Sequence, residues 1–199
     1  LLAIAVFAAL DSDIPAIRRS TLLTIQPDDV FSHLRLAATR IILVYAVLTS
    51  IIWLALILTG NTPFVAIPLA FGSISTGGYA PFSGGLDEHL GAVSITLVML
   101  GCLVGAVNFS LYWDALRDRK AWLDIDLAGI AILVTVLAAF FIIASPGYLL
   151  QNLARAVFVV TTSGYAYGTA AMPVLVAAIF IAMIGGAAGS TTGGIKISR

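Results

Sequence analysis

The chain has 199 residues, of which 60% are hydrophobic and 10% are charged, and its acidic and basic side chains balance to a formal net charge of zero. A mean hydropathy of +1.07 lies far above that of a soluble domain, so the composition predicts an integral membrane protein. Nothing in the charge pattern suggests a nucleic-acid partner, and membrane lipid is the partner that composition predicts.

The chain begins with an apolar stretch, residues 1–10, that is too short to cross about 30 Å of hydrocarbon alone. We expect it to be the end of a truncated helix. Residues 11–35 contain two prolines, a pair of arginines and a pair of aspartates, which are typical of an aqueous connection. Residues 36–60 form the first apolar span that is long enough to cross the membrane.

A shorter apolar segment, residues 62–74, follows this span and opens with Thr62 and Pro63. These two residues suit the N-cap and the first position of a helix. About 12 helical residues reach roughly 18 Å, which is only part of the way through a bilayer. The segment is therefore predicted to enter the membrane and stop, bringing the sequence STGGY (residues 75–79) to mid-depth. Residues 81–89 would return the chain to water and residues 90–113 would cross back.

A second cycle follows the connection at residues 114–126 and repeats the order of the first. It comprises a span at 127–144, Ser145-Pro146, a short segment at 148–160, the sequence TTSGY at 161–165 and a return helix at 170–184 that is broken at Gly185. Aligning Gly78 with Gly164 gives a repeat of about 86 residues, which suits two spans and a re-entrant hairpin.

The fold class predicted from this order is an all-α polytopic membrane protein. Its units are helix, re-entrant half-helix and helix, and the last helix is broken. The expected organisation is a repeat at 36–113, a cytoplasmic connection at 114–126 and a truncated repeat at 127–199. Lys and Arg gather in the connections 11–35 and 114–126 and after the final break, so the positive-inside rule makes that side cytoplasmic.

The two matching sequences STGGY and TTSGY have the chemistry of a cation site. A dehydrated monovalent cation needs several oxygen ligands, which backbone carbonyls of an extended loop supply without a full charge that would trap the ion. Glycine allows the backbone to turn successive carbonyls toward one axis, and a half-helix ending at the loop points its negative dipole end at the cation. An isolated cluster of this kind is more often a tight turn or helix contact, but two copies at matching places favour the ion site.

A third polar break, residues 185–196 with the sequence GGAAGSTTGGIK, interrupts the last helix. Its glycines cost roughly 1 kcal/mol each relative to alanine in a helix, so a mobile loop is expected. Its hydroxyls could contact a passing ion. A phosphate-binding loop does not fit, because Ile195 separates Gly194 from Lys196 and the preceding segment is a membrane helix.

These three stretches, with residues 105–110 (GAVNFS), resemble the Trk/Ktr/HKT superfamily of potassium transporters, most closely its TrkH-like branch. The resemblance covers nearly the whole chain, from the end of a first repeat to most of a third. It implies four pore repeats around one axis and potassium uptake through a channel-like pore in a cell membrane, the inner membrane of a bacterium. It also implies a homodimer, a cytoplasmic nucleotide-binding regulatory subunit and no cofactor beyond the transported potassium ion.

On that mapping the potassium-binding filter residues are Thr76, Gly77, Gly78, Tyr79, Thr162, Ser163, Gly164 and Tyr165. The gate loop beneath the filter comprises Gly185, Gly186, Gly189, Ser190, Thr191, Thr192, Gly193, Gly194 and Lys196. No other metal site is expected.

Other interpretations remain open from the sequence alone. An alternating-access carrier with broken helices at its substrate site is the alternative function, although no span contains Asp or Glu for a proton relay. An enzyme is not expected, since no nucleophile and base pair or carboxylate dyad lies at membrane depth. Arg155, inside the second half-helix, could repel cations, brace a filter loop, or snorkel outward or pair with Asp87 or Glu88.

Overall fold

The computed structural model describes residues 27–109, 111–112, 125–144, 148–168 and 190–193. Within these residues every regular element is a helix. In chain order the elements are α2 (Pro27–Leu58), α3 (Pro63–Ile74), α4 (Leu86–His89), α5 (Ala92–Ala106), α7 (Ile125–Ala144) and α8 (Leu149–Val160). The predicted helix end at 1–10, the return helix at 170–184 and most of both connections lie outside the described residues.

Helix boundaries recur at the 86-residue spacing that the sequence indicates. Helix α8 begins at Leu149, 86 residues after Pro63, and ends at Val160, 86 residues after Ile74. Helix α7 ends at Ala144, 86 residues after Leu58, the last residue of α2. The residues that precede α3 and α8, Thr62 and Tyr148, also share nearly the same extended backbone angles.

Two of the helices are long and apolar enough to cross a membrane. They are the segments Ala38–Leu58 of α2 and Leu127–Ala144 of α7, and only 17% and 28% of their most apolar windows are buried inside the structure. Large side chains such as Ile51 and Ile143 therefore point outward. Because an outward apolar surface of this extent is stable only against lipid or further protein, both helices suit a bilayer.

The half-helices α3 and α8 are too short to cross a membrane. Each has 12 residues, which corresponds to roughly 18 Å at 1.5 Å per residue. Pro63 occupies the start of α3, where its missing N–H costs nothing, and the Thr62 carbonyl accepts the amides of Val65 and Ala66 at 3.0 and 2.9 Å. Both segments thus have the length of a helix that ends inside the membrane.

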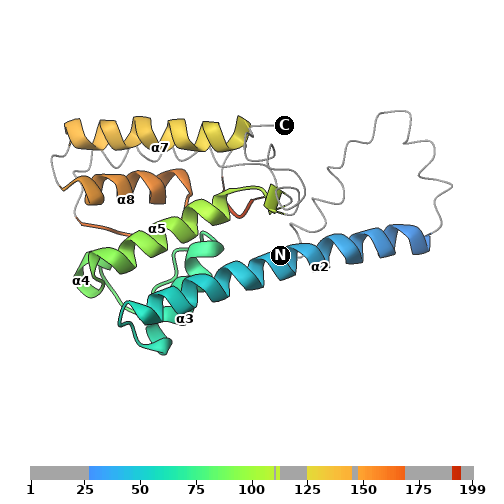
Figure 1. Cartoon of the computed structure of the whole chain (residues 1–199). Coiled ribbons are helices and arrows are strands. Elements are labelled where there is room, and N and C mark those ends of the chain that lie inside the picture. The colour runs from blue at the N-terminus through green and yellow to red at the C-terminus, as the bar shows by residue number, and fades with distance from the viewer. Residues whose placement is uncertain (1–26, 110, 113–124, 145–147, 169–189, 194–199) are drawn as a thin grey trace.

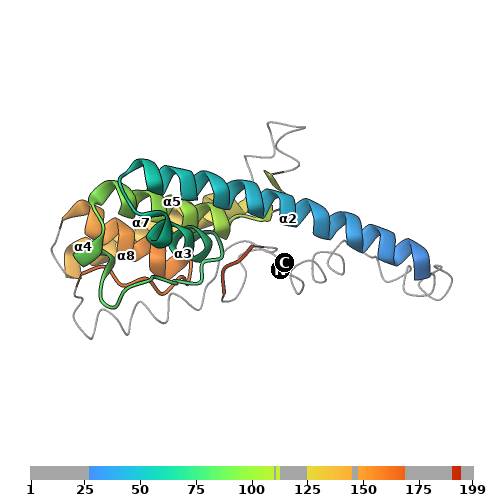
Figure 2. The same cartoon turned by 90° about the horizontal axis from the view of Figure 1, so that it is seen from below.

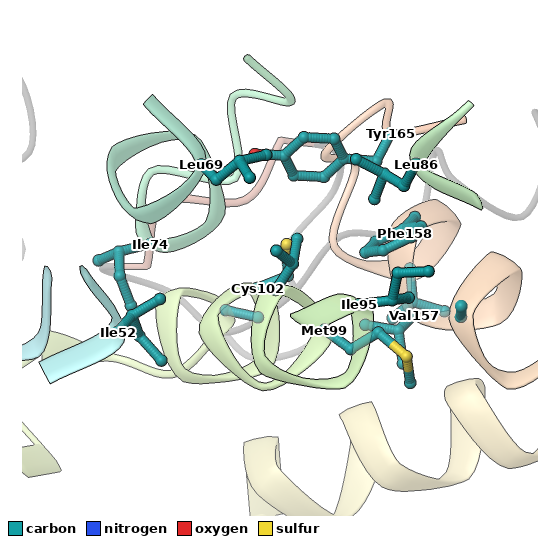
Figure 3. Close-up of a cluster of buried hydrophobic side chains, with 14 of the residues drawn as sticks. Ile52, Leu69, Ile74, Leu86, Ile95, Met99, Cys102, Val157, Phe158 and Tyr165 are labelled. Carbon is teal, nitrogen blue, oxygen red and sulfur yellow. The ribbon is translucent and has the colours of Figure 1, made fainter. Parts of the chain in front are cut away.

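Helix α5 lies between the pair α2 and α3 and the pair α7 and α8 (Figure 1). Its buried face carries Ile95, Met99 and Cys102, which lie close to Val157 and Phe158 of α8 in the core (Figure 3). Core residues of α3, among them Leu69 and Ile74, lie on the other side of this cluster. One helix therefore holds the two half-helices at a fixed separation.

Two glycines four residues apart allow α5 to approach α3 closely. A Cβ at Gly101 would come within 2.5 Å of the Ser73 Oγ, and a Cβ at Gly105 would collide with the backbone carbonyl oxygen of Ile74. This is the small-residue spacing that brings membrane helices together. Gly105 lies against the last carbonyl of α3, so its lack of a side chain decides how the two helices meet.

Helix α5 is shorter than the span predicted to run to residue 113. It ends at Ala106, and Val107 is extended, with φ −82° and ψ 148°. The amide and the hydroxyl of Thr191 both donate to the Gly105 carbonyl oxygen, at 3.1 and 2.8 Å. Since that carbonyl is satisfied by another segment, the helix can stop inside the membrane without leaving it unpaired.

We expect Gly105→Ala in the full-length protein to lower the free energy of unfolding by about 1–3 kcal/mol, the usual cost of overpacking a core. The new methyl group would meet backbone rather than a side chain that can rotate away. Thermal unfolding in detergent measures the change. Gly91→Ala is the matched control, because a Cβ at Gly91, which precedes the same helix, meets nothing within 4 Å. Equal stability of the two variants would contradict the packing role of Gly105.

Candidate functional site

The half-helices α3 and α8 end in the same way. In α3 the amide of Thr76 donates to the Ser73 carbonyl at 3.0 Å, and the amide of Gly77 donates to the Gly72 carbonyl at 2.8 Å. In α8 the amides of Thr162 and Ser163 make the equivalent bonds, both at 3.0 Å. This pair of bonds is the Schellman motif, in which the residue after the cap adopts a left-handed conformation.

Threonine occupies the left-handed position in both motifs, where glycine is usual. Thr76 has φ +50° and Thr162 has φ +53°. A β-branched residue in this region costs of order 1–3 kcal/mol, and such strain gathers at functional sites. Two residues later the backbone is left-handed again, at Gly78 (φ +66°) and Gly164 (φ +77°). The loops 75–79 and 161–165, which we call the first and second loop, therefore have matching backbones.

The two loops touch each other directly. Gly78 lies so close to the second loop that a Cβ there would collide with the Ser163 carbonyl oxygen. The Tyr165 hydroxyl donates to the Tyr79 carbonyl oxygen at 3.1 Å, joining residues 86 positions apart. Figure 3 places the Tyr165 ring between the half-helices, close to Leu69. The second loop is thus tied to the first at two points.

An open hollow of about 290 Å³ lies where the two loops meet the residues that follow them. It is lined by Gly78, Tyr79, Ala80, Phe82, Gly84, Leu86, Gly164, Tyr165 and Ala166. Most of these residues belong to the two loops or directly follow them. The hollow is therefore a shared space between the two repeats.

The segment 190–193 is hydrogen-bonded to both loops. The Thr76 hydroxyl donates to the Thr191 carbonyl oxygen at 3.0 Å, and the Gly193 amide donates to the Thr162 hydroxyl at 2.8 Å. The two threonines with left-handed backbones therefore hold the same segment. The segment 190–193, drawn in red, lies beside the C-terminal end of α5 in both views (Figure 1, Figure 2).

Thr191 contacts the ends of two helices. Its hydroxyl lies 3.0 Å from the Ile74 carbonyl oxygen and 2.8 Å from that of Gly105, and its amide donates to Gly105 as well. One side chain thereby satisfies a terminal carbonyl of α3 and of α5. Ser190 and Thr192, both buried, share a hydrogen bond of 2.9 Å between their hydroxyls.

The structure brings most of the site residues predicted from the sequence into one region. All eight residues expected in the filter lie in the two contacting loops, and Ser190, Thr191, Thr192 and Gly193 lie beside them. Gly185, Gly186, Gly189, Gly194 and Lys196 lie outside the described residues. Among those described, no group of three or more His, Cys, Asp or Glu side chains could hold a metal ion. The oxygens available in the loops are therefore carbonyls and hydroxyls.

Sequence reasoning assigned no role of its own to Gly105 or Ile74, whose carbonyls anchor Thr191. The repeat contained the signal, because Gly105 and Thr191 are 86 positions apart. Equivalent positions of two repeats around a shared axis lie close to that axis if they touch. The spacing alone could not tell which equivalent positions make contact.

The architecture defines the class of this protein as an α-helical membrane protein built from repeats with re-entrant half-helices. No family model matches the sequence. The Trk system potassium uptake protein TrkI of Halomonas elongata is 31% identical over 171 residues, covering 78% of this chain and 34% of the relative. The corresponding TrkH of Escherichia coli K12 is 28% identical over 174 residues, covering 79% and 36%.

The crystal structure of the potassium transporter TrkH from Vibrio parahaemolyticus superimposes with a TM-score of 0.76 at 23% identity, covering 98% of this chain and 42% of that one. The all-α polytopic fold is confirmed, and so is the predicted resemblance to TrkH-like potassium transporters. The chain spans about a third of the length of the curated relatives. Those relatives are named as potassium uptake proteins and the solved structure as a potassium transporter, in agreement with the expectation that the chain is not an enzyme.

We expect Tyr165→Phe to loosen the contact between the two loops. The substitution removes only the hydroxyl that donates to Tyr79, so full-length protein should lose about 0.5–1.5 kcal/mol of unfolding free energy. Thermal unfolding of the variant and of the unmodified protein in the same detergent measures this loss. Tyr148→Phe, at an exposed tyrosine, is the control. If both variants unfold at the unmodified temperature, the hydroxyl does not tie the loops.

Proposed function

We propose that this chain supplies two filter loops and part of an intramembrane gate to a channel-like pore that carries K⁺ into the cell. One observation carries the proposal. Two half-helices of equal length end in the same strained turn, their loops touch, and both loops are bonded to the segment 190–193. The names of the relatives, which refer to potassium uptake, support the choice of ion.

The electrostatics of the loops suit a monovalent cation. Each half-helix presents the negative end of its dipole at the loop. The favourable interaction of a unit positive charge with such a helix end is typically about 0.3–1 kcal/mol. Carbonyl and hydroxyl oxygens can replace water around a dehydrated ion without a full charge that would hold it too tightly. In this proposal Thr76, Gly77, Gly78 and Tyr79 act together with Thr162, Ser163, Gly164 and Tyr165 as filter residues.

A complete pore needs loops from further repeats. A Cβ at Gly164 would meet nothing within 4 Å, whereas the equivalent Gly78 is covered by Ser163. Tyr79 is 72% exposed, whereas the equivalent Tyr165 is 7% exposed against the first loop. Each loop thus has one neighbour and one open side. These open sides support a ring of loops, in which further loops of a longer protein would lie against them and complete the ion path.

The segment 190–193 is proposed to be the part of the gate loop that touches the filter, with Gly185, Gly186, Gly189, Gly194 and Lys196 as its other members. Direct bonds between the two loops favour a fixed filter over the alternating-access alternative, in which the halves would have to separate. The repeats at 36–113 and 127–199, a bacterial inner membrane, a homodimer and a nucleotide-binding regulatory subunit belong to the same proposal, on the family resemblance alone.

Substituting the filter glycines tests the ion path. We expect Gly78→Ser and Gly164→Ser in the full-length protein to lower the K⁺/Na⁺ flux ratio by roughly tenfold or more, because a left-handed non-glycine residue costs about 1–3 kcal/mol and shifts the carbonyls. Cation flux into proteoliposomes measures the ratio. Gly60→Ser is the control, at a left-handed glycine outside the loops with nothing within 4 Å of its Cβ. Selectivity unchanged in both filter variants would refute the assignment.

Substituting Thr191 tests the gate. Thr191→Val keeps the shape of the side chain but removes the hydroxyl that reaches Ile74 and Gly105, so we expect the closed gate to lose about 1–3 kcal/mol and basal K⁺ flux to rise. Thr191→Ser restores a hydroxyl and should return flux toward the unmodified value. Flux that is equal in the Val and Ser variants would mean that the hydroxyl does not hold the gate closed.

A further inference from the structure

The two half-helices differ sharply at one buried position. Arg155 of α8 is only 8% exposed, and the residue 86 positions earlier, Leu69 of α3, is fully buried. An arginine therefore occupies one half-helix where the other carries leucine. A cation buried at membrane depth is costly and would repel a passing K⁺, so its presence calls for a physical reason.

The Arg155 guanidinium lies against the backbone that leaves the second loop. Its Nε donates to the Tyr167 carbonyl oxygen at 2.9 Å. A Cβ at Gly168 would come within 2.8 Å of the Arg155 Nη2 and would also collide with the Gln151 side chain. Gly168 has φ +62°, which glycine adopts without strain. The tight fit shows that the side chain packs on residues 167 and 168.

The neighbouring repeat holds the same backbone from the other side. The Leu86 amide donates to the Ala166 carbonyl at 2.9 Å, and the Gly168 amide donates to the Asp87 Oδ1 at 2.9 Å. Leu86 and Asp87 are the first two residues of α4. Residues 166, 167 and 168 are thus each held by a hydrogen bond, from two different repeats.

Asp87 carries the charge opposite to that of Arg155, and both side chains lie against Gly168: the Asp87 Oδ1 accepts from its amide, and the Arg155 Nη2 lies 2.8 Å from where its Cβ would be. An arginine with an opposite charge nearby repels a passing cation less than an isolated arginine does. The planar guanidinium offers several donors in a fixed arrangement, which suits it to hold backbone carbonyls in place. Residue 166 follows Tyr165 directly, so fixing residues 166–168 fixes the outer end of the second loop.

We propose that Arg155 is a positioning residue for ion selectivity, which, together with Asp87, holds the outer end of the second loop at the width a dehydrated K⁺ requires. This inference rests on the proposed function of the loops. The arginine fixes the backbone that leaves the second loop. Arg155 acts through this backbone and does not contact the ion.

The test is cation flux through full-length protein in liposomes, with K⁺, Rb⁺ and Na⁺ compared in each variant. Arg155→Leu introduces the residue that α3 carries at the equivalent position, and Arg155→Lys keeps the charge but loses the Nε donor. We expect both to lower the K⁺/Na⁺ ratio by roughly tenfold, the effect of losing one hydrogen bond to a charged group. Arg40→Leu, which removes a cation from an exposed site on α2, should leave the ratio unchanged.

A purely electrostatic role gives a different pattern. In that case Arg155→Lys would match the unmodified protein, and Arg155→Leu would carry all cations faster at an unchanged ratio. The double variant Arg155→Leu with Asp87→Asn, which is neutral again, would then recover the unmodified flux. Any of these three results would overturn the positioning role.

Amide hydrogen exchange separates this inference from the proposed function. The Gly168 amide donates to Asp87, so its exchange should accelerate by about tenfold or more in Asp87→Ala, which removes the acceptor, and also in Arg155→Leu if the two side chains act as one clamp. If unmodified protein carries no K⁺, the proposed function fails and the exchange result still decides whether the clamp exists. If unmodified protein is K⁺-selective and Arg155→Leu keeps both its selectivity and its protection, only the positioning role is overturned.

Discussion

The structure depends on one constraint, the need to satisfy the last carbonyls of helices that end inside a membrane. In hydrocarbon no water can pair with them, and each unpaired group costs several kcal/mol. Helices α3 and α8 meet the constraint with Schellman turns, and α3 and α5 meet it with the hydroxyl and amide of Thr191. The same carbonyl-rich ends are what a cation site requires, so the solution to a folding problem also forms the candidate site.

A second consequence is that the loops and the segment 190–193 are one bonded unit. Thr76 and Thr162 hold the left-handed backbone of their own loop and also bond to that segment. A movement of residues 190–193 would therefore remove partners from both loops and from the ends of α3 and α5. In the proposed pore, coupling between the gate and the filter would need no separate pathway, because the segment 190–193 and the two loops share their hydrogen bonds.

The 86-residue repeat accounts for the matching backbones of the two half-helices and loops. Different side chains at equivalent positions account for their different contacts. Both half-helices and both turns obey the 86-residue spacing. Of the two equivalent tyrosines, however, only Tyr165 is buried against the neighbouring loop, and of the two half-helices only α8 carries an arginine. Equivalent backbones with different side chains allow one architecture to hold loops whose surroundings differ. The Leu86 amide and the Asp87 side chain join the two repeats at residues 166–168, while Thr191 joins them at the ends of α3 and α5.

The sequence by itself determined the membrane class, the two half-helices and the two loop motifs, because hydropathy, segment length and an 86-residue repeat are local or periodic properties. It also singled out Arg155 without choosing among its roles. The early end of α5, the tie from Tyr165 to Tyr79 and the anchoring of Thr191 on Gly105 were decided only in the tertiary structure. These features depend on which groups from distant segments meet, and a carbonyl freed from its own helix is satisfied only by whatever donor the fold brings to it.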